Sequence, residues 1–269
     1  MTASARSLGA GVLHPQDAAA RFSLRRHRPP GDLAPFIDFC WVVQWDLRGE
    51  PAHDQSILPH PNVNLAFEPE GASVYGVDRR VFTRRISGAG RVLGIRFRPG
   101  GFRPFYSASI STLNDLVVPA RDIFGPAADR AGAAVLAAPC DEAMIAAAAA
   151  LLRGAGPRPD PVAADVAGIV ERITADPELR QVASLADAFG MPERRLQRLF
   201  AEYVGVSPKW VMRRARLHEA ALRADAGGPD SDVDWAALAA DLGYADQAHL
   251  TRDFTATLGV PPSRYRATG

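Results

Sequence analysis

The chain has 269 residues, of which 47% are hydrophobic and 23% are charged. This length and composition suit two globular domains, or one large domain, with enough apolar residues to form a core. The formal net charge is +1, so the overall charge gives no reason to expect binding to nucleic acid or to a membrane surface. Any basic surface that binds such a partner must therefore be local.

The amino-terminal and the most apolar segments predict neither a secretory signal nor a membrane span. The segment MTASARSLGAGVLHPQ lacks the basic and then apolar pattern of a signal peptide. The longest apolar run, AMIAAAAALL, has about half of the ~20 residues that a spanning helix needs. The two cysteines, Cys40 and Cys140, are far apart and indicate neither a disulfide framework nor a zinc motif. We therefore expect a cytoplasmic protein without a membrane segment.

Residues 36–98 have the pattern of short β-strands. FIDFCWVVQWDL is rich in aromatic and β-branched residues, NVNLAFE alternates, and proline and glycine separate such segments. Short strands at this spacing are typical of a sandwich or a small barrel. From about residue 102 the sequence becomes helical, and GAGPRPDP at 154–161 is the clearest linker.

These changes of pattern divide the chain into three parts. We expect a β-rich regulatory domain at 20–125, a helical connector and linker at 126–156, and a helical domain at 157–269. The predicted fold class is α+β, with a β-rich barrel or sandwich followed by an all-α domain. The connector is also a candidate dimerisation element, so a homodimer is left open.

An internal repeat in the helical half is the strongest pattern in the sequence. LADAFGMPERRLQRLFAEYVGVSP aligns with LAADLGYADQAHLTRDFTATLGVPP. The residues that recur in the second half of each copy are Leu196, Arg198, Phe200, Gly205 and Pro208, matched by Leu250, Arg252, Phe254, Gly259 and Pro262. Each copy predicts a short helix, a glycine-containing turn and a second helix, which together form a helix-turn-helix. Asp246 suits the N-cap of the second helix in the second copy, and Gly205 and Gly259 are expected to end the second helices in a left-handed turn.

The second helix of each copy has an apolar face and an opposite polar face. The outward-facing residues are Arg194, Gln197 and Arg198 in the first copy and Gln247, Thr251 and Arg252 in the second. Arginine can pair with guanine, glutamine can pair with adenine, and threonine can contact the methyl group of thymine. Arginines on a single helix are often only a solvated face. Their duplication favours helices that recognise base edges in a major groove.

The segment between the two copies, SPKWVMRRARLHEAALRADA, predicts one bridging helix with Ser207 as N-cap and Pro208 at its first position. About eighteen residues would span roughly 27 Å, close to the ~34 Å between successive major grooves on one side of DNA. Two units on this spacer can enter adjacent groove segments of double-stranded DNA. Further candidate DNA-binding residues on this helix are Lys209, Arg213 and Arg214.

Residues 160–267 resemble the DNA-binding domain of the AraC/XylS family of transcription regulators. LGYADQAHLTRDFTATLGVPPSRYR is similar to that family's carboxy-terminal signature, and RLQRLFAEYVGVSPKWVMRRARL resembles its first helix-turn-helix and bridging helix. The resemblance implies contacts with bases at the outward-facing residues named above, and it adds His249 to the surface of the second copy. It also implies double-stranded DNA as a partner and RNA polymerase as a further candidate partner.

Residues 20–125 resemble the uncharacterised amino-terminal domain found beside such regulators, with LPHPNVNLAFE and GIRFRPGGF as the similar segments. This resemblance implies a cupin-like β-fold that senses a small-molecule effector. The aromatic residues of the predicted strands either line a cavity for such a ligand or simply fill the core. They are Phe36, Phe39, Trp41, Trp45 and Phe67.

Other chemistry has weaker support in the residues. His53, Asp54 and His60 invite a metal site of the kind that cupin-like barrels can hold, but their spacing matches no template. Cys140 has no nearby basic partner that would activate its thiol. We therefore expect no metal, no cofactor and no enzymatic activity. The alternatives are a cupin-like metalloenzyme fused to a DNA-binding anchor, and a helical module that binds protein.

Overall fold

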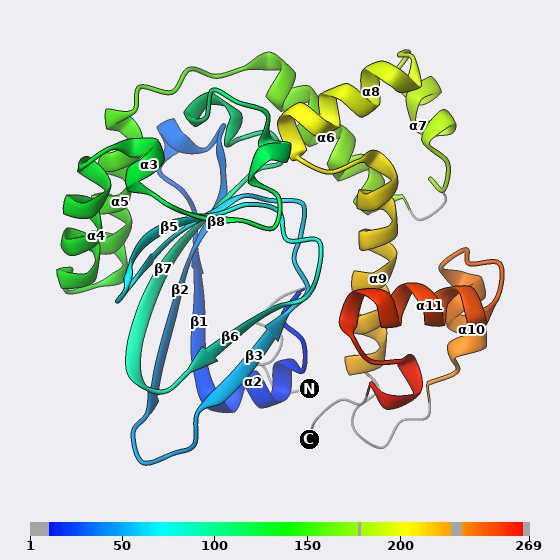
Figure 1. Ribbon diagram of the computed structural model, residues 1–269, viewed down its shortest axis with the longest axis horizontal. Helices are drawn as coiled ribbons and strands as arrows, with labels where there is room; N and C mark the ends of the chain where they lie inside the picture. Colours follow the sequence, from blue (N-terminus) through cyan, green and yellow to red (C-terminus); the bar gives the residue numbers. More distant parts are fainter. Residues whose placement is uncertain (1–10, 177–178, 227–232, 266–269) are drawn as a thin grey trace.

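The computed structural model describes residues 11–176, 179–226 and 233–265. A β-rich amino-terminal part lies beside a helical carboxy-terminal part, and a long helix, α9, runs along the boundary between them (Figure 1). This arrangement confirms the predicted α+β fold. No helix in these ranges has the length and apolarity needed to cross a membrane.

Two antiparallel sheets form the amino-terminal part. The larger sheet has the strand order β1 (Phe22–His27), β2 (Ile37–Leu47), β7 (Gly88–Phe97), β4 (Asn64–Glu68), β5 (Gly71–Tyr75) and β8 (Val117–Pro119). The smaller sheet pairs β3 (His53–Ile57) with β6 (Phe82–Ile86). A short helix, α2 (Pro15–Arg21), precedes the first strand.

The larger sheet is covered on both faces, which explains why β2 is apolar along most of its length. Side chains alternate along a strand, so neighbouring residues point to opposite faces. Cys40 and Val42 are buried in the main core, whereas Trp41 and Val43 face the smaller sheet. The larger sheet therefore has a core face and a second face that lines a cavity.

Helices α3 (Arg121–Phe124), α4 (Ala127–Ala137) and α5 (Asp141–Gly154) follow the last strand, and α4 and α5 cover the core face (Figure 1). Arg91 of β7 donates hydrogen bonds to the carbonyl groups of Leu136 and Ala138. Arg25 and His27 of β1 hold the Asp141 carboxylate at 2.7 Å. Most of the segment 126–156 is thus packed into the amino-terminal domain, since the apolar residues of its alanine-rich helices share one core with the sheet.

Six helices form the carboxy-terminal part. They are α6 (Pro161–Ala175), α7 (Val182–Ala188), α8 (Glu193–Leu199), α9 (Pro208–Ala226), α10 (Trp235–Asp241) and α11 (Gln247–Leu258), counted within the described ranges. The linker expected at 154–161 ends where Asp160 caps α6 by accepting a hydrogen bond from the Val162 amide at 2.9 Å. Pro161 occupies the first position of that helix.

Candidate nucleic-acid interface and ligand cavity

The first helix-turn-helix consists of α7, a turn at Gly190 and α8. Leu196 and Phe200 are fully buried and anchor the second helix in the core of this unit. A π-helical turn at Phe200–Val204 extends α8, and the helix ends at Gly205, whose φ of 94° is in the left-handed region. This confirms the helix end that the repeated glycine predicts.

The second unit consists of α10, a turn at Gly243 and α11. Asp246 caps α11, since its carboxylate accepts a hydrogen bond from the His249 amide at 2.7 Å. Phe254 is fully buried, and its ring packs edge-to-face against Trp235 and Tyr265 at centroid distances of 5.4 and 5.2 Å. The two units therefore share a fold but have different cores.

The polar faces predicted for the second helices are present in both units. On α8 the exposed residues include Arg194, Gln197 and Arg198. On α11, Gln247 and Arg252 are exposed, whereas His249 and Thr251 are half-buried. The His249 ring packs edge-on against Tyr244 at 5.1 Å, so it lies at the rim of the exposed face.

The bridging helix α9 begins at Pro208, as predicted, and the Ser207 hydroxyl accepts a hydrogen bond from the Trp210 amide at 3.2 Å. Its 19 residues span roughly 28 Å. Lys209 is exposed at the start of the helix. Arg213 forms an ion pair with Asp253 of α11, with 3.0 Å between Nε and Oδ2, and so holds the second unit against α9.

Arg214 does not lie where a DNA contact requires it. The residue is only 3% exposed, and its guanidinium donates hydrogen bonds to the carbonyl oxygens of Arg79 (2.8 Å) and Pro59 (3.4 Å). It also lies 4.4 Å above the Trp210 ring, and burial lowers its pKa to about 10. Arg214 therefore contacts the amino-terminal domain. The sequence predicted that this side of α9 is exposed for DNA binding, whereas it is packed against that domain.

The two domains meet along α9 and at the end of α8. The His218 ring stacks on His60 at 3.9 Å and approaches the Pro59 carbonyl at 3.2 Å. Burial lowers the pKa of His218 to about 3, so the ring is neutral and its Nε2–H can donate that hydrogen bond. Asn114 donates a hydrogen bond of 2.6 Å to the carbonyl of Gly205. The first helix-turn-helix unit and the bridging helix α9 are thus docked against the amino-terminal domain.

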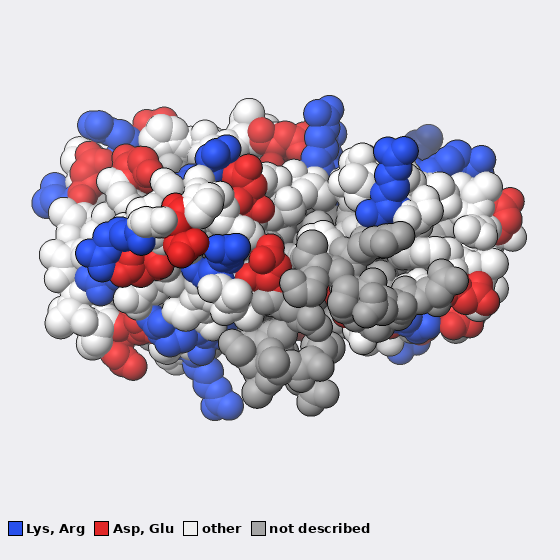
Figure 2. Space-filling model, turned by 90° about the horizontal axis from the view of Figure 1, so that it is seen from below, with Lys and Arg blue, Asp and Glu red and all other residues white. Residues whose placement is uncertain are grey.

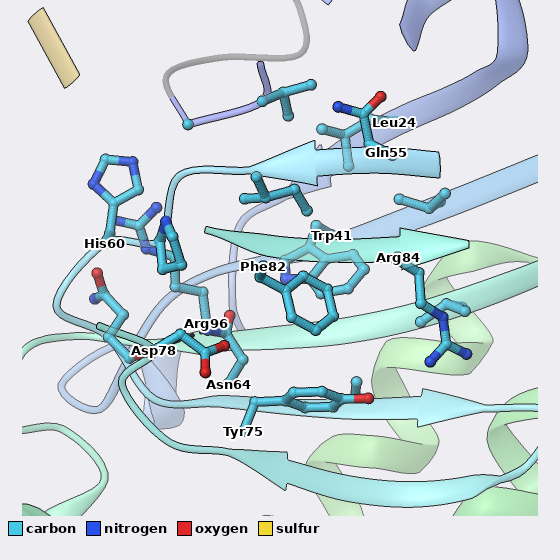
Figure 3. A pocket seen from close by; sticks show the side chains of 18 of the residues that line it. Leu24, Trp41, Gln55, His60, Asn64, Tyr75, Asp78, Phe82, Arg84 and Arg96 are labelled. Carbon is cyan, nitrogen blue, oxygen red and sulfur yellow. Dashed lines mark hydrogen bonds between the residues drawn. The ribbon is translucent and has the colours of Figure 1, made fainter. Parts of the chain in front are cut away.

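A cavity of about 240 Å³ lies between the larger sheet and the smaller sheet (Figure 3). Of the five aromatic residues singled out in the sequence, Phe36 and Phe67 belong to the core, whereas Phe39, Trp41 and Trp45 line the cavity. The sequence left open whether these aromatic residues line a cavity or fill the core, and each alternative holds for some of them.

Two glycines make room for the cavity-lining tryptophans. A Cβ atom at Gly94 would lie 2.0 Å from the Trp41 ring, and one at Gly90 would lie 2.5 Å from the Trp45 ring. Each glycine pairs across β2 and β7 with the tryptophan that covers it. The indole rings can therefore lie flat on the sheet, which leaves the space above them open.

The three residues considered for a metal site have separate neighbours. His53 is 3.2 Å from the side-chain oxygen of Gln55, Asp54 pairs with Arg85 at 3.5 Å, and His60 stacks on His218. Among the residues that the structure describes, no group of three His, Cys, Asp or Glu side chains is placed to hold a metal ion.

Comparisons with known proteins agree with this division of the chain. A helix-turn-helix domain family matches residues 185–268, and a domain of unknown function (DUF6597) matches residues 25–119. No curated protein sequence matches the chain.

Among solved structures, the chain is similar to ToxT from Vibrio cholerae. A 1.65 Å structure of ToxT has 11% sequence identity and a TM-score of 0.41, and the match covers 91% of this chain and 97% of that one. ToxT bound to (E)-4-(8-methylnaphthalen-1-yl)but-3-enoic acid has 10% identity and a TM-score of 0.40, with coverage of 91% and 98%. Likeness at this level is too distant to assign a function. The family matches thus show a carboxy-terminal helix-turn-helix domain joined to an amino-terminal domain of unknown function.

Proposed function

We propose that the protein is a sequence-specific DNA-binding transcription regulator whose two helix-turn-helix units recognise adjacent major-groove segments. The observation that carries this proposal is the duplicated exposed face on α8 and α11. Both faces offer an arginine and a glutamine, Arg198 and Gln197 in the first unit and Arg252 and Gln247 in the second. These side chains can form paired hydrogen bonds with guanine and adenine.

The spacing of the two faces supports recognition by one protein molecule. Contacts from α9 hold the second unit in place, namely the Arg213–Asp253 ion pair and the Arg216 guanidinium 4.5 Å above the Tyr244 ring. The length of α9, roughly 28 Å, is comparable with the ~34 Å between major grooves on one side of the duplex. The two recognition helices are therefore expected to contact half-sites about one helical turn apart.

We also propose that an effector in the amino-terminal cavity controls DNA binding. The support is a thin wall between the cavity and the helical domain. Leu58, Pro59 and His60 line the cavity, and the same residues contact α9 through the core around Leu217, through hydrogen bonds to the Pro59 carbonyl and through the stacked imidazole rings. A ligand that moves this wall would change how α9 is docked.

Selection of bound sequences from random double-stranded DNA, with the full chain, tests the proposal. The expected product is a two-part sequence with its halves about 10 base pairs apart. Repeating the selection with Arg252→Ala should relax the sequence of one half only, and Arg130→Ala, at an exposed position on α4, serves as the matched control. A protein that enriches no sequence would contradict the proposal, and a single undivided site would contradict recognition by two units.

A further inference from the structure

The concave face of the larger sheet carries apolar side chains that belong to no core. Phe39, Trp41 and Trp45 of this sheet and Phe82 of β6 line the cavity, and none of them is part of the three apolar cores formed by the described residues. Apolar surface left in contact with water costs about 25 cal/mol per Å². Aromatic rings turned toward an open space therefore favour an apolar occupant.

The size of the cavity limits that occupant to a compact molecule. An engineered apolar cavity of about 150 Å³ is known to accept benzene. The present cavity, at about 240 Å³, has room for an aromatic ring with a short side chain or for two fused rings. The indole of Trp41, which lies on Gly94 in the larger sheet, and the Phe82 ring of the smaller sheet both line the cavity and provide stacking surfaces for such rings (Figure 3).

The two ends of the cavity differ in charge. At one end Arg84 pairs with Glu68 at 3.3 Å and with Glu70 at 3.2 Å, and the Tyr75 hydroxyl donates a hydrogen bond of 2.5 Å to Glu68. The Arg84 cation at this end is thus neutralised by carboxylates of the protein itself. Figure 3 shows Arg84 there, far from the group formed by Arg96, Asn64, Asp78 and His60 at the other end.

At that other end two cations share one aromatic ring. The Arg26 and Arg96 guanidinium groups lie 4.6 and 5.1 Å from the centroid of Phe39. The Arg96 side chain is 20% exposed, and burial, with repulsion from Arg26, lowers its pKa to about 10 although Asp38 opposes this. The Asp38 carboxylate is 3.3 Å from Arg96 Nε, but the geometry gives that buried Nε no hydrogen bond among the described residues.

Asp78 is the carboxylate that lines the cavity beside Arg96. Burial and repulsion from Asp115 raise its pKa, so its charged form is disfavoured. Asp38, which attracts both guanidinium groups, is the second carboxylate at this end. Two cations thus face Asp38 and a carboxylate whose charge is disfavoured, and an anionic group from a ligand would add negative charge there. A carboxylate suits it best, because its two oxygens match the planar donor pair of a guanidinium.

We propose that the cavity binds a compact aromatic monocarboxylate, with its ring among Trp41, Phe82 and Phe39 and its carboxylate at Arg96 and Arg26. The ligand fills the apolar space and gives the Arg96 Nε an acceptor. The inference rests on the proposed effector role of the cavity, and it names the chemical class of that effector.

Calorimetric titration of the full chain with one matched series tests the inference. The probes are 3-phenylpropanoate, 3-phenylpropanamide and 3-phenylpropan-1-amine, which share one ring and one chain length, and octanoate, which keeps the charge without the ring. The acid should bind about ten-fold or more tightly than the amide, since a hydrogen bond to a charged partner is the stronger kind. The amine and octanoate should bind more weakly than the aromatic acid.

Two variants locate the carboxylate. Arg96→Gln should reduce the affinity for the acid to that for the amide and leave the amide unchanged, and Arg26→Gln should act in the same direction if the Arg96 variant does not fold. Arg84→Gln, at the neutralised end, is the matched control and should keep the preference for the acid. Equal binding of acid and amide, preference for the amine or for octanoate, or no binding in the series would overturn the inference.

A mobility shift on the selected DNA, with the same preparation, separates this inference from the proposed function. DNA binding without preference for the aromatic acid would overturn the ligand class alone. Binding of the acid by a chain that selects no DNA would overturn the regulator and leave the ligand class standing.

Discussion

The two helix-turn-helix units have equivalent buried anchors but different surroundings. Leu196 and Phe200 in the first unit and Leu250 and Phe254 in the second are all fully buried. The core around Phe200 is mainly aliphatic, and the end of its helix is docked on the amino-terminal domain through Asn114. The core around Phe254 combines leucines and alanines with Trp235 and Tyr265, whose rings pack against Phe254. The repeated sequence thus determines the buried anchors of each unit, whereas the contacts of each unit with the rest of the protein depend on residues outside the repeat.

Removal of the equivalent phenylalanine should give the largest effect. Phe200→Ala and Phe254→Ala should each destabilise their own unit by about 3–5 kcal/mol, because each leaves a cavity in a filled core. Hydrogen exchange of the full chain, followed by peptide, should show faster exchange in α7–α8 for the first variant and in α10–α11 for the second. Leu222→Ala, at a position that is 47% exposed, is the control. Faster exchange in both units for either variant would show that they unfold together.

A second difference is a buried carboxylate at the end of α9, beside the second unit. Asp225 accepts hydrogen bonds from the Tyr265 hydroxyl at 3.2 Å, and burial raises its pKa to about 6. An unfolded aspartate has a pKa near 3.9, so the folded state favours the protonated form. Protonated Asp225 therefore stabilises the folded state below about pH 4. This contribution to the free energy of unfolding, up to about 3 kcal/mol, is lost as the pH rises through about 6.

Asp225→Asn isolates this effect, since its amide oxygen can still accept the hydrogen bond from Tyr265. The stability of the variant relative to the unmodified chain should increase between pH 4 and pH 8, as measured by thermal unfolding. His14, whose pKa burial lowers, contributes with the opposite sign and lies 3.8 Å from the Asp225 carboxylate, so the comparison is repeated with His14→Gln in both proteins. A difference that stays constant with pH would mean that Asp225 titrates normally.

The features that the sequence predicted correctly are mainly local ones. The caps at Ser207 and Asp246 and the left-handed helix ends at Gly205 and Gly259 depend on residues within one turn of the helix. The burial of Arg214 depends on carbonyl groups more than 130 residues earlier in the chain, which helical periodicity does not reveal.

The sequence left a cavity open as an alternative, but it could not show which aromatic residues line it, for a similar reason. Gly94 and Trp41 are distant in sequence and meet only through the register of β2 and β7. The same holds for the segment 126–156. Its alanine-rich pattern predicts helices, but the sheet that covers them is specified elsewhere in the chain.

A third prediction compares the arginines of the two recognition helices. Arg198 and Arg252 are repeat partners, and both are exposed. Arg198→Ala and Arg252→Ala should each cost about 1–3 kcal/mol on the selected DNA and relax the preference at one base position, in different halves of the site. Quantitative mobility shifts on single-base variants of the site provide the measurement, with Arg130→Ala as control. A loss that is equal on all sequences would identify a phosphate contact instead.

The last and smallest expected difference is electrostatic. Residues 190–216 contain seven basic side chains against two glutamates, whereas residues 230–266 contain three against six aspartates. In the structure, not all of these charged side chains are free to contact DNA. Arg214 is buried and Arg213 is paired with Asp253, so neither suits a test of free charge. Arg266, and two of the six aspartates, lie outside the described residues.

The four described aspartates of the second unit all have structural partners. Asp234 and Asp246 cap α10 and α11, Asp241 pairs with Arg223, and Asp253 pairs with Arg213. Their repulsion of DNA is therefore smaller than the count of charges suggests. The remaining asymmetry lies in the exposed cations. In the described residues of these ranges they are Arg194, Arg195, Arg198 and Lys209 in the first unit and Arg252 and Arg264 in the second.

Because each neutralised phosphate contributes about 0.9 to the slope of log affinity against log salt, these cations can be compared directly. Arg195→Gln with Lys209→Gln should reduce the slope by up to about 1.8 if both residues contact phosphates. Arg264→Gln with Arg266→Gln should reduce it by less, because the second unit has fewer exposed cations and because Asp246 occupies the amino-terminal end of α11, where a phosphate would otherwise bind. Binding isotherms at four salt concentrations give both slopes, and Arg130→Gln should leave the slope unchanged. Equal reductions would show that the second unit holds the DNA backbone as firmly as the first, and that the aspartates at its helix ends are too well satisfied to weaken the contact.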